Sequence, residues 1–441
     1  MKNLTTFQLA LIALFLGFIL IGTLIFAGIL PGYRSPSGGQ AGELTIWGTV
    51  PASNVQDIIE NFNRSYKDYF SLRYVEKAGA SLERDFVEAK ADNRAPDLLL
   101  LPHELGLTQR SRLAAIPTTM LSLRDYRDTY VDAGELWVGA NGVSALPLVV
   151  DPIVLYYNRD LLNTAGLPTV PETWSQFVAR TIALTKFDSR RNILQSAVAF
   201  GETRNIAHAK DLISLLLLQA GNPIVAVQSN RLVSTLNQDF KFTVKPAVAV
   251  TDFYTQFSDP ARPNYSWNHS LPEARTAFSR GQTIFYFGYA SEYSTIAREN
   301  PHLVFDVALP PQSGELGRPS LTLGRLLSVA AVAGGSKVNA AAAAALGLAA
   351  AAPTADWSKL LYLPPARRDL LGQKVEDPVM ALFYRAAILA RTWFDPDPVG
   401  TKKILEAMVE SVVTGRSQSS ESVATADKDL NNLIGRIYGT P

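Results

Sequence analysis

Aromatic, acidic and basic residues stand directly after several predicted strands of this sequence. In open α/β sheets, ligands bind beyond the carboxyl ends of the strands. Aromatic rings stack on the C–H face of a sugar, and carboxylates and guanidinium groups bind its hydroxyl groups. We therefore expect a polyhydroxylated ligand at this edge of the sheet. The candidate binding residues from this rule are Trp47, Gly48, Thr49, His103, Glu104, Glu202, Arg204 and Tyr289.

Several of these residues also have a purely structural interpretation. Trp47 is then a core residue at a strand end, and His103 makes an internal hydrogen bond. Glu104 and Glu202 are then acidic residues that stabilise the N-termini of helices through the helix dipole. The sequence alone leaves both interpretations open.

Motifs of common enzyme classes are absent. The sequence contains no Gly-x-Ser-x-Gly, no Gly-x-Gly-x-x-Gly and no phosphate-binding Gly-Lys-Ser/Thr loop. No histidine follows His103-Glu104 at the spacing of a zinc protease, and Asp395-Pro396-Asp397 is best interpreted as a turn. The chain has no cysteine and four histidines, which excludes thiolate chemistry and argues against a multi-histidine metal centre. We expect no catalytic residue, no metal and no cofactor.

Composition favours a large folded protein without a nucleic-acid partner. The 441 residues suffice for two or three domains. Hydrophobic residues make up 47% of the chain and charged residues 18%, which excludes a disordered polypeptide. The 41 basic residues nearly balance the 40 acidic ones, so there is no basic excess for binding phosphate backbones.

The N-terminus predicts a membrane anchor. Lys2 and Arg34 enclose 31 uncharged residues, and the nearly continuous apolar run 9–30 has 22 residues. As a helix it would measure about 33 Å, enough to span a bilayer. The run is longer than the core of a cleavable signal, and no Ala-x-Ala site follows. We therefore expect a cytoplasmic N-terminus at 1–6, an uncleaved transmembrane helix at 7–30 and a flexible tether at 31–42, with all later residues outside.

The pattern after the tether alternates strands and helices, as in a doubly wound parallel sheet. Strands are predicted at 44–47, 70–75, 98–101, 196–200, 283–287, 304–309 and 326–333. Helices are predicted after Ser53 and Ser81, at 173–184, 211–220 and 340–352, after Glu273, and along most of the chain from Asp377 onward. Capping boxes are predicted at Ser53/Gln56, Thr173/Gln176 and Ser270/Glu273.

The segment Leu146–Phe177, LPLVVDPIVLYYNRDLLNTAGLPTVPETWSQF, resembles the family 1 extracellular solute-binding proteins of ABC importers, the maltose-binding-protein-like group. It matches their Leu/Tyr-Pro strand, their Leu-x-Tyr-Asn-Lys/Arg-Asp-Leu segment and their Pro-x-Thr-Trp motif in order. The flanking segments 43–47, 95–98 and 277–289 agree with the same pattern. Together these features cover about residues 43–435.

The resemblance implies an α/β fold of the periplasmic-binding-protein type, with two discontinuous lobes joined by crossover hinge strands. Lobe 1 would comprise 43–150 and 325–376, and lobe 2 would comprise 151–324 and 377–441. Asp151 stands on the first crossover, where a polar residue of the family reaches the ligand, and 323–328 resembles the return crossover. Trp393 lies near the place of a late aromatic ligand contact. Tyr156, Tyr157 and Asn158 are interpreted as packing and turn residues.

Two departures separate this chain from the family pattern. Many members are lipoproteins with an acylated cysteine, and this chain has no cysteine, so the N-terminal helix would have to anchor it. Tyr289 stands where a tryptophan is common, and Pro102-His103-Glu104 has no aromatic residue, which argues against maltodextrin as the ligand.

The resemblance therefore implies a monomeric, non-enzymatic receptor in the cell membrane with its lobes on the extracellular or periplasmic side. It would capture a small polar solute, a sugar or oligosaccharide, by hinge closure and deliver it to an ABC permease. One alternative is a membrane-tethered sensor or interaction module with the same fold. Another is an iron or polyamine receptor, for which Tyr286 and Tyr289 lie on a suitable strand.

Overall fold

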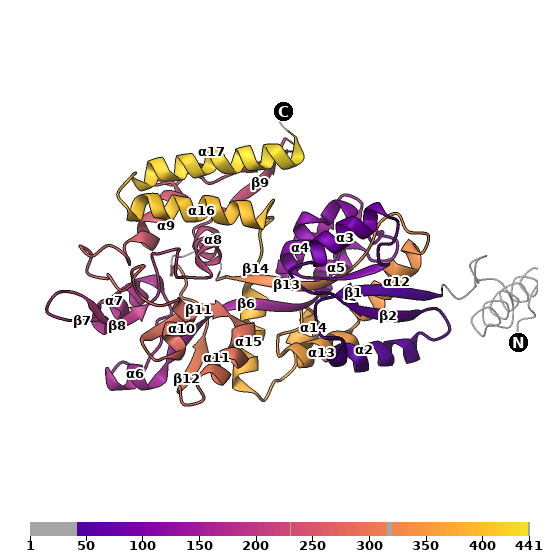
Figure 1. Ribbon diagram of the computed structural model, residues 1–441, viewed down its shortest axis with the longest axis horizontal. Helices are drawn as coiled ribbons and strands as arrows, with labels where there is room; N and C mark the ends of the chain where they lie inside the picture. Colours follow the sequence, from indigo (N-terminus) through magenta and orange to yellow (C-terminus); the bar gives the residue numbers. More distant parts are fainter. Residues whose placement is uncertain (1–41, 230, 315–319, 440–441) are drawn as a thin grey trace, which may run out of the picture.

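The computed structural model describes residues 42–229, 231–314 and 320–439. These residues form two α/β lobes side by side, joined by long strands at the centre of the molecule (Figure 1). The predicted cytoplasmic end, the membrane anchor at 7–30 and the tether up to residue 41 lie outside the described residues.

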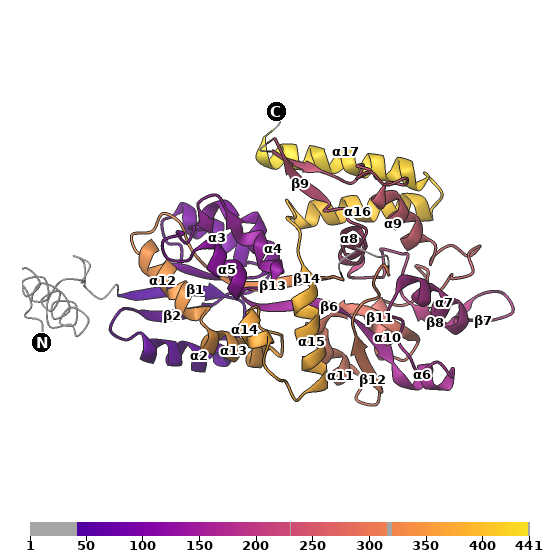
Figure 2. The same ribbon diagram turned by 180° about the vertical axis from the view of Figure 1, so that it is seen from behind.

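Lobe 1 contains the N-terminal sheet and the helices on its two faces. In both views α3 and α4 lie above the sheet, and α2 and α13 lie below it (Figures 1 and 2). Its elements are β1 (Glu43–Gly48), α2 (Ala52–Ser65), β2 (Ser71–Glu76), α3 (Leu82–Ala91), β3 (Leu98–Leu101), α4 (His103–Thr108), η1 (Arg110–Arg112), α5 (Leu123–Thr129), η2 (Asp132–Trp137), β4 (Val138–Gly139), β5 (Gly142–Val143), α12 (Val338–Leu348), α13 (Ala351–Leu361) and α14 (Arg368–Leu371).

Lobe 2 has the same layered plan. In both views α8, α16 and α17 lie above its sheet, and α10 and α11 lie below it (Figures 1 and 2). Its elements are α6 (Arg159–Thr164), α7 (Trp174–Leu184), β7 (Lys186–Phe187), β8 (Ile193–Val198), α8 (Ala209–Gln219), β9 (Val225–Gln228), β10 (Arg231–Ser234), α9 (Pro246–Thr255), α10 (Ala274–Ser279), β11 (Thr283–Tyr289), η3 (Ala290–Glu292), α11 (Tyr293–Glu299), β12 (Phe305–Ala308), α16 (Pro398–Val413) and α17 (Ser419–Tyr438).

Two long strands cross between the lobes. They are β6 (Leu146–Asn158), with 13 residues, and the antiparallel β13 (Thr322–Ala331), with 10 residues. The first half of β6 pairs with β13, and its second half pairs with β11 and β12 of lobe 2. Helix α15 (Pro378–Leu389) packs against β6, and β14 (Ala390–Arg391) pairs with β13. The predicted crossover at 323–328 is thus confirmed as part of β13.

Hydrogen bonds connect the strands into a mixed ten-stranded path in the order β2-β1-β3-β13-β6-β11-β8-β7, with β12 and β14 beside it. The path is continuous because β6 and β13 belong to both lobes. Lobe 1 contributes the parallel strands β1, β2 and β3, and lobe 2 contributes the parallel pair β8 and β11. The carboxyl ends of β3 and β11 therefore both point toward the crossover.

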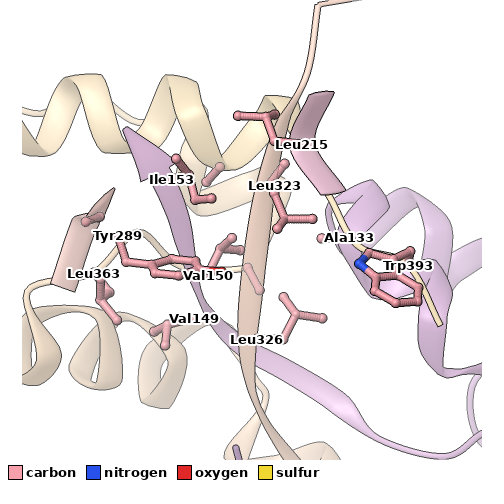
Figure 3. Close-up of a cluster of buried hydrophobic side chains, with 14 of the residues drawn as sticks. Ala133, Val149, Val150, Ile153, Leu215, Tyr289, Leu323, Leu326, Leu363 and Trp393 are labelled. Atoms are coloured by element: carbon pink, nitrogen blue, oxygen red, sulfur yellow. The ribbon is translucent and has the colours of Figure 1, made fainter. Parts of the chain in front are cut away.

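Apolar side chains fix the crossover in place. Strand β3 is buried along its whole length, as expected for the run Leu98–Leu101, and the residues of β6 are almost all buried. Figure 3 shows side chains of β6 and β13, among them Ile153, Leu323 and Leu326, packed together with Leu215 of α8 nearby. One hydrophobic core thus continues through both lobes.

One segment pair of lobe 1 has the composition of a membrane span. Among the described residues, no single helix is long and apolar enough to cross a membrane. The consecutive helices α12 and α13 together have the length and apolar composition of a membrane span, with a bend of 66° between them.

Candidate functional site

A pocket lies where the two lobes meet at β13. From lobe 1 it receives the first residues of α4, which begins directly after the end of β3. From lobe 2 it receives the first turn of α8 and the end of β11. The segment before α16 contributes Trp393 and Asp395. Its polar and aromatic lining residues are His103, Glu104, Lys210, Asp211, Tyr289, Arg325, Trp393 and Asp395.

Arg325 of β13 is the centre of this pocket. Its Nε lies 3.2 Å from Glu104 of lobe 1, and its terminal nitrogen lies 2.9 Å from Asp211 of lobe 2. The guanidinium carbon also lies 4.0 Å from the centre of the Tyr289 ring, a cation–π contact. Burial alone would lower the pKa of Arg325, but the surrounding acidic groups outweigh burial and raise it. One charged side chain therefore links both lobes to the crossover.

A second set of charges lies beside this bridge in lobe 2. Lys210 Nζ is 2.6 Å from Asp395, and the His208 ring lies between the carboxylates of Asp211 and Glu292. Burial would lower the pKa of His208, but the neighbouring carboxylates of Asp211 and Glu292 raise it to about 9. Burial would raise the pKa of Asp211, but its contacts with His208 and Arg325 hold it at about 2. Both groups are therefore charged at neutral pH.

Two buried polar atoms in the pocket have no hydrogen-bond partner among the described residues, Tyr289 Oη and His103 Nδ1. Tyr289 is 1% exposed, so its hydroxyl group is desolvated without compensation. Burial lowers the pKa of His103 to about 4, so its ring is neutral at pH 7. The space left between these side chains is about 20 Å³. That volume admits about one water molecule.

Asp151 occupies the predicted crossover but does not line the pocket. It stands opposite Arg325 in the register of β6 and β13. Its two carboxylate oxygens accept hydrogen bonds from the backbone N–H of Ser291 at 2.9 Å and from its hydroxyl group at 2.7 Å. Burial raises the pKa of Asp151 to about 6 against the opposing effect of these bonds. Asp151 thus ties the crossover to η3 in this structure.

The other sequence candidates lie apart from this pocket. Trp47 is half-buried with Lys77 Nζ 3.9 Å from its ring centre, and Gly48 packs against Tyr74. Thr49, next in the chain, is not among the pocket residues either. Glu202 is buried 3.7 Å from His269, and Arg204 pairs with Glu410 of α16.

The structure therefore brings together four of the ten candidates, His103, Glu104, Tyr289 and Trp393. Sequence reasoning missed Arg325, Lys210 and Asp211. The available signal for Arg325 was a single charge inside the apolar run Leu321–Ala331. Asp395 was interpreted only as a turn residue. Nothing in the neighbouring sequence indicated that it would pair with Lys210.

Residues of the signature segment have the packing roles expected for them. Tyr156 is fully buried, and its hydroxyl group donates to the backbone oxygen of Tyr289 at 2.6 Å. Asn158 accepts a hydrogen bond from Leu161 N and caps α6. Tyr286, which suggested an iron site, donates its hydroxyl hydrogen to Glu292 at 2.6 Å. Within the described ranges, no group of three or more acidic or histidine residues is arranged to hold a metal ion.

Two lobes joined by two crossover strands, with a charged and partly aromatic pocket between them, define the class of two-lobed binding proteins. Comparison with known proteins supports this class. The family model described as "Bacterial extracellular solute-binding protein" matches residues 57–381 of the 441. The chain therefore belongs to the bacterial extracellular solute-binding proteins, which confirms the resemblance found in the sequence.

Individual relatives are distant. A galactooligosaccharide-binding protein of Bacillus subtilis (strain 168) is 25% identical over 154 residues, which cover 34% of this chain and 35% of that protein. The alignment thus spans about a third of the length of that relative.

Solved structures show the fold. A cyclo/maltodextrin-binding protein complexed with maltotetraose has a TM-score of 0.72 at 16% identity, covering 91% of this chain and 99% of that one. The sugar-binding protein MalE from Xanthomonas citri has a TM-score of 0.71 at 16% identity, covering 89% and 98%.

Proposed function

We propose that this protein is a receptor that captures a carbohydrate between its lobes and delivers it to an ABC permease. The observation that carries the proposal is the link from Glu104 through Arg325 to Asp211. It joins lobe 1, the crossover and lobe 2 in the place where a ligand would contact both lobes. A ligand that binds the closed arrangement better than the open one shifts the hinge equilibrium toward closure.

The proposed ligand class follows from the pocket walls. Tyr289 and Trp393 supply aromatic surfaces. The buried Tyr289 hydroxyl group and His103 Nδ1 have no hydrogen-bond partner among the described residues, so a ligand can bond to them. Carboxylates and a guanidinium group held in fixed positions are suited to hydroxyl groups. The names of the relatives, a galactooligosaccharide-binding and a maltodextrin-binding protein, support a sugar as the ligand.

A thermal-shift screen tests this function directly. Sugars of one to three units would be compared with polyamines and ferric ion on the full-length chain. A ligand at 100 times its Kd stabilises the native state by about 2.7 kcal/mol, which gives a clear rise in Tm. We expect sugars to raise Tm. A rise with polyamine or iron and none with any sugar would contradict the proposal.

The proposed location is the outer face of the cell membrane, with 7–30 as an uncleaved anchor. Lobe limits at 43–150 with 325–376, and at 151–324 with 377–441, would put the hinge in β6 and β13. Membrane fractionation and N-terminal sequencing test the anchor. Recovery of a soluble mature chain that begins near Gly42 would contradict it.

Co-purification with a permease would favour import over a sensor or interaction role.

A further inference from the structure

The amino-terminal edge of the lobe 1 sheet lies on the far side of this lobe from the pocket around Arg325. Strands β1, β2 and β3 are parallel, so their carboxyl ends point toward the crossover and their amino ends point away from it. In both views the start of β1 lies at the outer end of lobe 1, and β7 lies at the outer end of lobe 2 (Figures 1 and 2). The amino-terminal edge therefore faces away from lobe 2.

The described chain enters the fold at this edge. The backbone N–H of Ser71 donates to the carbonyl oxygen of Gly42 at 3.4 Å, and Lys337 Nζ donates to the carbonyl oxygen of Glu43 at 2.7 Å. The entry point is thus held from one side by β2 and from the other by the residue before α12. Any segment that precedes Gly42 leaves lobe 1 from this point.

The proposed anchor would hold this edge near the bilayer. Between an anchor at 7–30 and β1 stand about 12 residues, which span at most about 40 Å when fully extended. The outer end of lobe 1 would have to stay within that distance of the lipid. Lobe 2 would be attached to the anchor only through the crossover.

Tyr69 is an exposed aromatic side chain on this edge. It stands in the turn 66–70 between α2 and β2, two residues before Ser71, and is 67% exposed. Its backbone N–H donates to the oxygen of Tyr66 at 2.9 Å, and the rings of Tyr66 and Phe70 stack with their centres 5.6 Å apart. Because its two aromatic neighbours pack together, the turn is fixed and holds the Tyr69 ring out from the surface.

The surroundings of Tyr69 suit the headgroup region of a membrane. Tyrosine rings collect at the boundary between headgroups and acyl chains, because one end of the side chain is apolar and the other polar. Lys67 is exposed in the same turn, and Arg73 and Lys337 lie beside the entry point. Such cations are attracted to anionic headgroups. Glu43 and Asp68 offset part of this charge, so the contact should depend mainly on the aromatic ring.

We propose that the turn 66–70 docks on the lipid headgroups beside the anchor, with the ring of Tyr69 in the bilayer interface. This inference rests on the proposed anchor at 7–30. It adds an orientation to the proposed function, in which the molecule stands on the outer end of lobe 1 and lobe 2 lies farthest from the lipid.

The test places a fluorophore at a single position, which is possible because the chain has no cysteine. The full-length chain would be reconstituted into vesicles of equal parts phosphatidylcholine and phosphatidylglycerol, with the environment-sensitive dye NBD attached at Asp68→Cys. Asp68 is exposed and adjacent to Tyr69, so the ring is retained. We expect a blue shift of the emission and its quenching by a lipid that carries a nitroxide in the headgroup region. The same dye at Ser189→Cys, in the exposed turn between β7 and β8, should show neither effect.

A second substitution tests the role of the ring. Tyr69→Ala in the Asp68→Cys background should remove most of the quenching by the lipid label. Tyr438→Ala is the matched control, because it removes a 53% exposed tyrosine at the end of α17 in lobe 2 and should leave the quenching unchanged. Urea denaturation shows whether each variant remains folded.

Three results would overturn the docking and leave the anchor standing. They are equal quenching at positions 68 and 189, no quenching at position 68, and quenching that is unchanged in Tyr69→Ala. Protection of the dye from a water-soluble quencher, without quenching by the lipid label, would show that protein covers this edge and would also overturn the docking. Failure of the full-length chain to float with the vesicles would overturn the anchor and the docking together.

Discussion

The hydroxyl group of Tyr289 is buried in the pocket around Arg325 without a partner among the described residues. A desolvated hydroxyl group costs about 1–3 kcal/mol. We therefore expect Tyr289→Phe to leave the free energy of unfolding unchanged or raise it by about 1 kcal/mol. If a sugar hydroxyl bonds to Tyr289, the same variant should bind ligand about 10-fold more weakly, which corresponds to about 1.4 kcal/mol. Urea denaturation and calorimetry measure the two effects.

Tyr254 provides the contrast for this experiment. It is also fully buried, but its hydroxyl group donates to the backbone oxygen of Glu202 at 2.8 Å. Tyr254→Phe should therefore lose about 1 kcal/mol of stability and keep its ligand affinity. A loss of stability in Tyr289→Phe as large as that in Tyr254→Phe would show that the Tyr289 hydroxyl has a partner.

His208 makes stability depend on pH in the alkaline range. Its pKa rises from 6.5 in the unfolded chain to about 9 in the folded protein, because the interactions with the carboxylates of Asp211 and Glu292 outweigh burial. The stabilisation is thus complete below about pH 6.5 and is lost as the pH rises through about 9. The shift corresponds to about 3 kcal/mol. We expect the difference in unfolding free energy between wild type and His208→Gln to shrink by about that amount from pH 6 to pH 10.

The measurement is urea denaturation across this pH range. His302→Gln is the matched control, because His302 is exposed on lobe 2. A stability difference for His208→Gln that stays constant from pH 6 to pH 10 would mean that His208 is not held charged between its two carboxylates.

At the residue scale, sequence reasoning named four residues that line this pocket and did not name Arg325 at its centre. His103, Glu104 and Tyr289 were predicted because each follows a strand whose carboxyl end faces the crossover. Arg325 was missed because it lies inside a strand, where the same rule does not apply. Glu202 and Arg204 also follow a strand, but partners in lobe 2 hold their side chains. Pairing between distant segments depends on side-chain packing, which local sequence does not encode.

At the scale of elements, the helix caps were also predicted only in part. Thr173 accepts from Gln176 N and caps α7 as predicted. The predicted cap Ser53 lies inside α2, which begins after Pro51, and Glu273 rather than Ser270 caps α10. The helices that were predicted are present because apolar periodicity extends over many residues, whereas α9 and α11 were not predicted. A cap depends on one residue, so a neighbouring proline or acid can displace it.

Gly324 allows β14 and β6 to approach β13 closely. A Cβ atom at this position would lie 2.9 Å from Ala390 Cβ and 3.1 Å from Val150 Cγ1. Because Ala390 and Val150 are packed in the core, the strands would have to separate. We expect Gly324→Ala to lower the free energy of unfolding by about 1–3 kcal/mol, as overpacking does. Urea denaturation measures this loss.

Gly335→Ala is the matched control, because a Cβ atom there would meet no heavy atom within 4 Å. It should change stability by less than about 0.5 kcal/mol. Equal stabilities of the two variants would show that the crossover accommodates a methyl group and is less tightly packed than the distances indicate.

For the whole molecule, the relation between the lobes depends on few connections. Strands β6 and β13 carry backbone hydrogen bonds between the lobes, Arg391 of β14 pairs with Asp132 of lobe 1 at 2.6 Å, and Arg325 adds an ionic link to each side. Opening of the lobes would separate Glu104 from Asp211, so Arg325 could keep contact with only one of them. In the proposed hinge motion, the ionic link would therefore favour the closed arrangement, and a bound ligand would add to the same preference.

Removal of this link should shift the molecule toward the open form. We expect Arg325→Met to give a larger radius of gyration than wild type without ligand, measured by small-angle X-ray scattering, and to return toward the wild-type value with saturating ligand. Part of the binding free energy of the ligand would then be needed to close the lobes. The affinity should therefore fall by about 5- to 150-fold, the range of typical coupling free energies of 1–3 kcal/mol.

Arg73→Met is the matched control. It removes an exposed ion pair with Glu43 within lobe 1, where both side chains are 55% exposed, and should change neither the radius of gyration nor the affinity. A radius of gyration in Arg325→Met equal to that of wild type, with unchanged affinity, would show that the crossover strands alone set the closed arrangement.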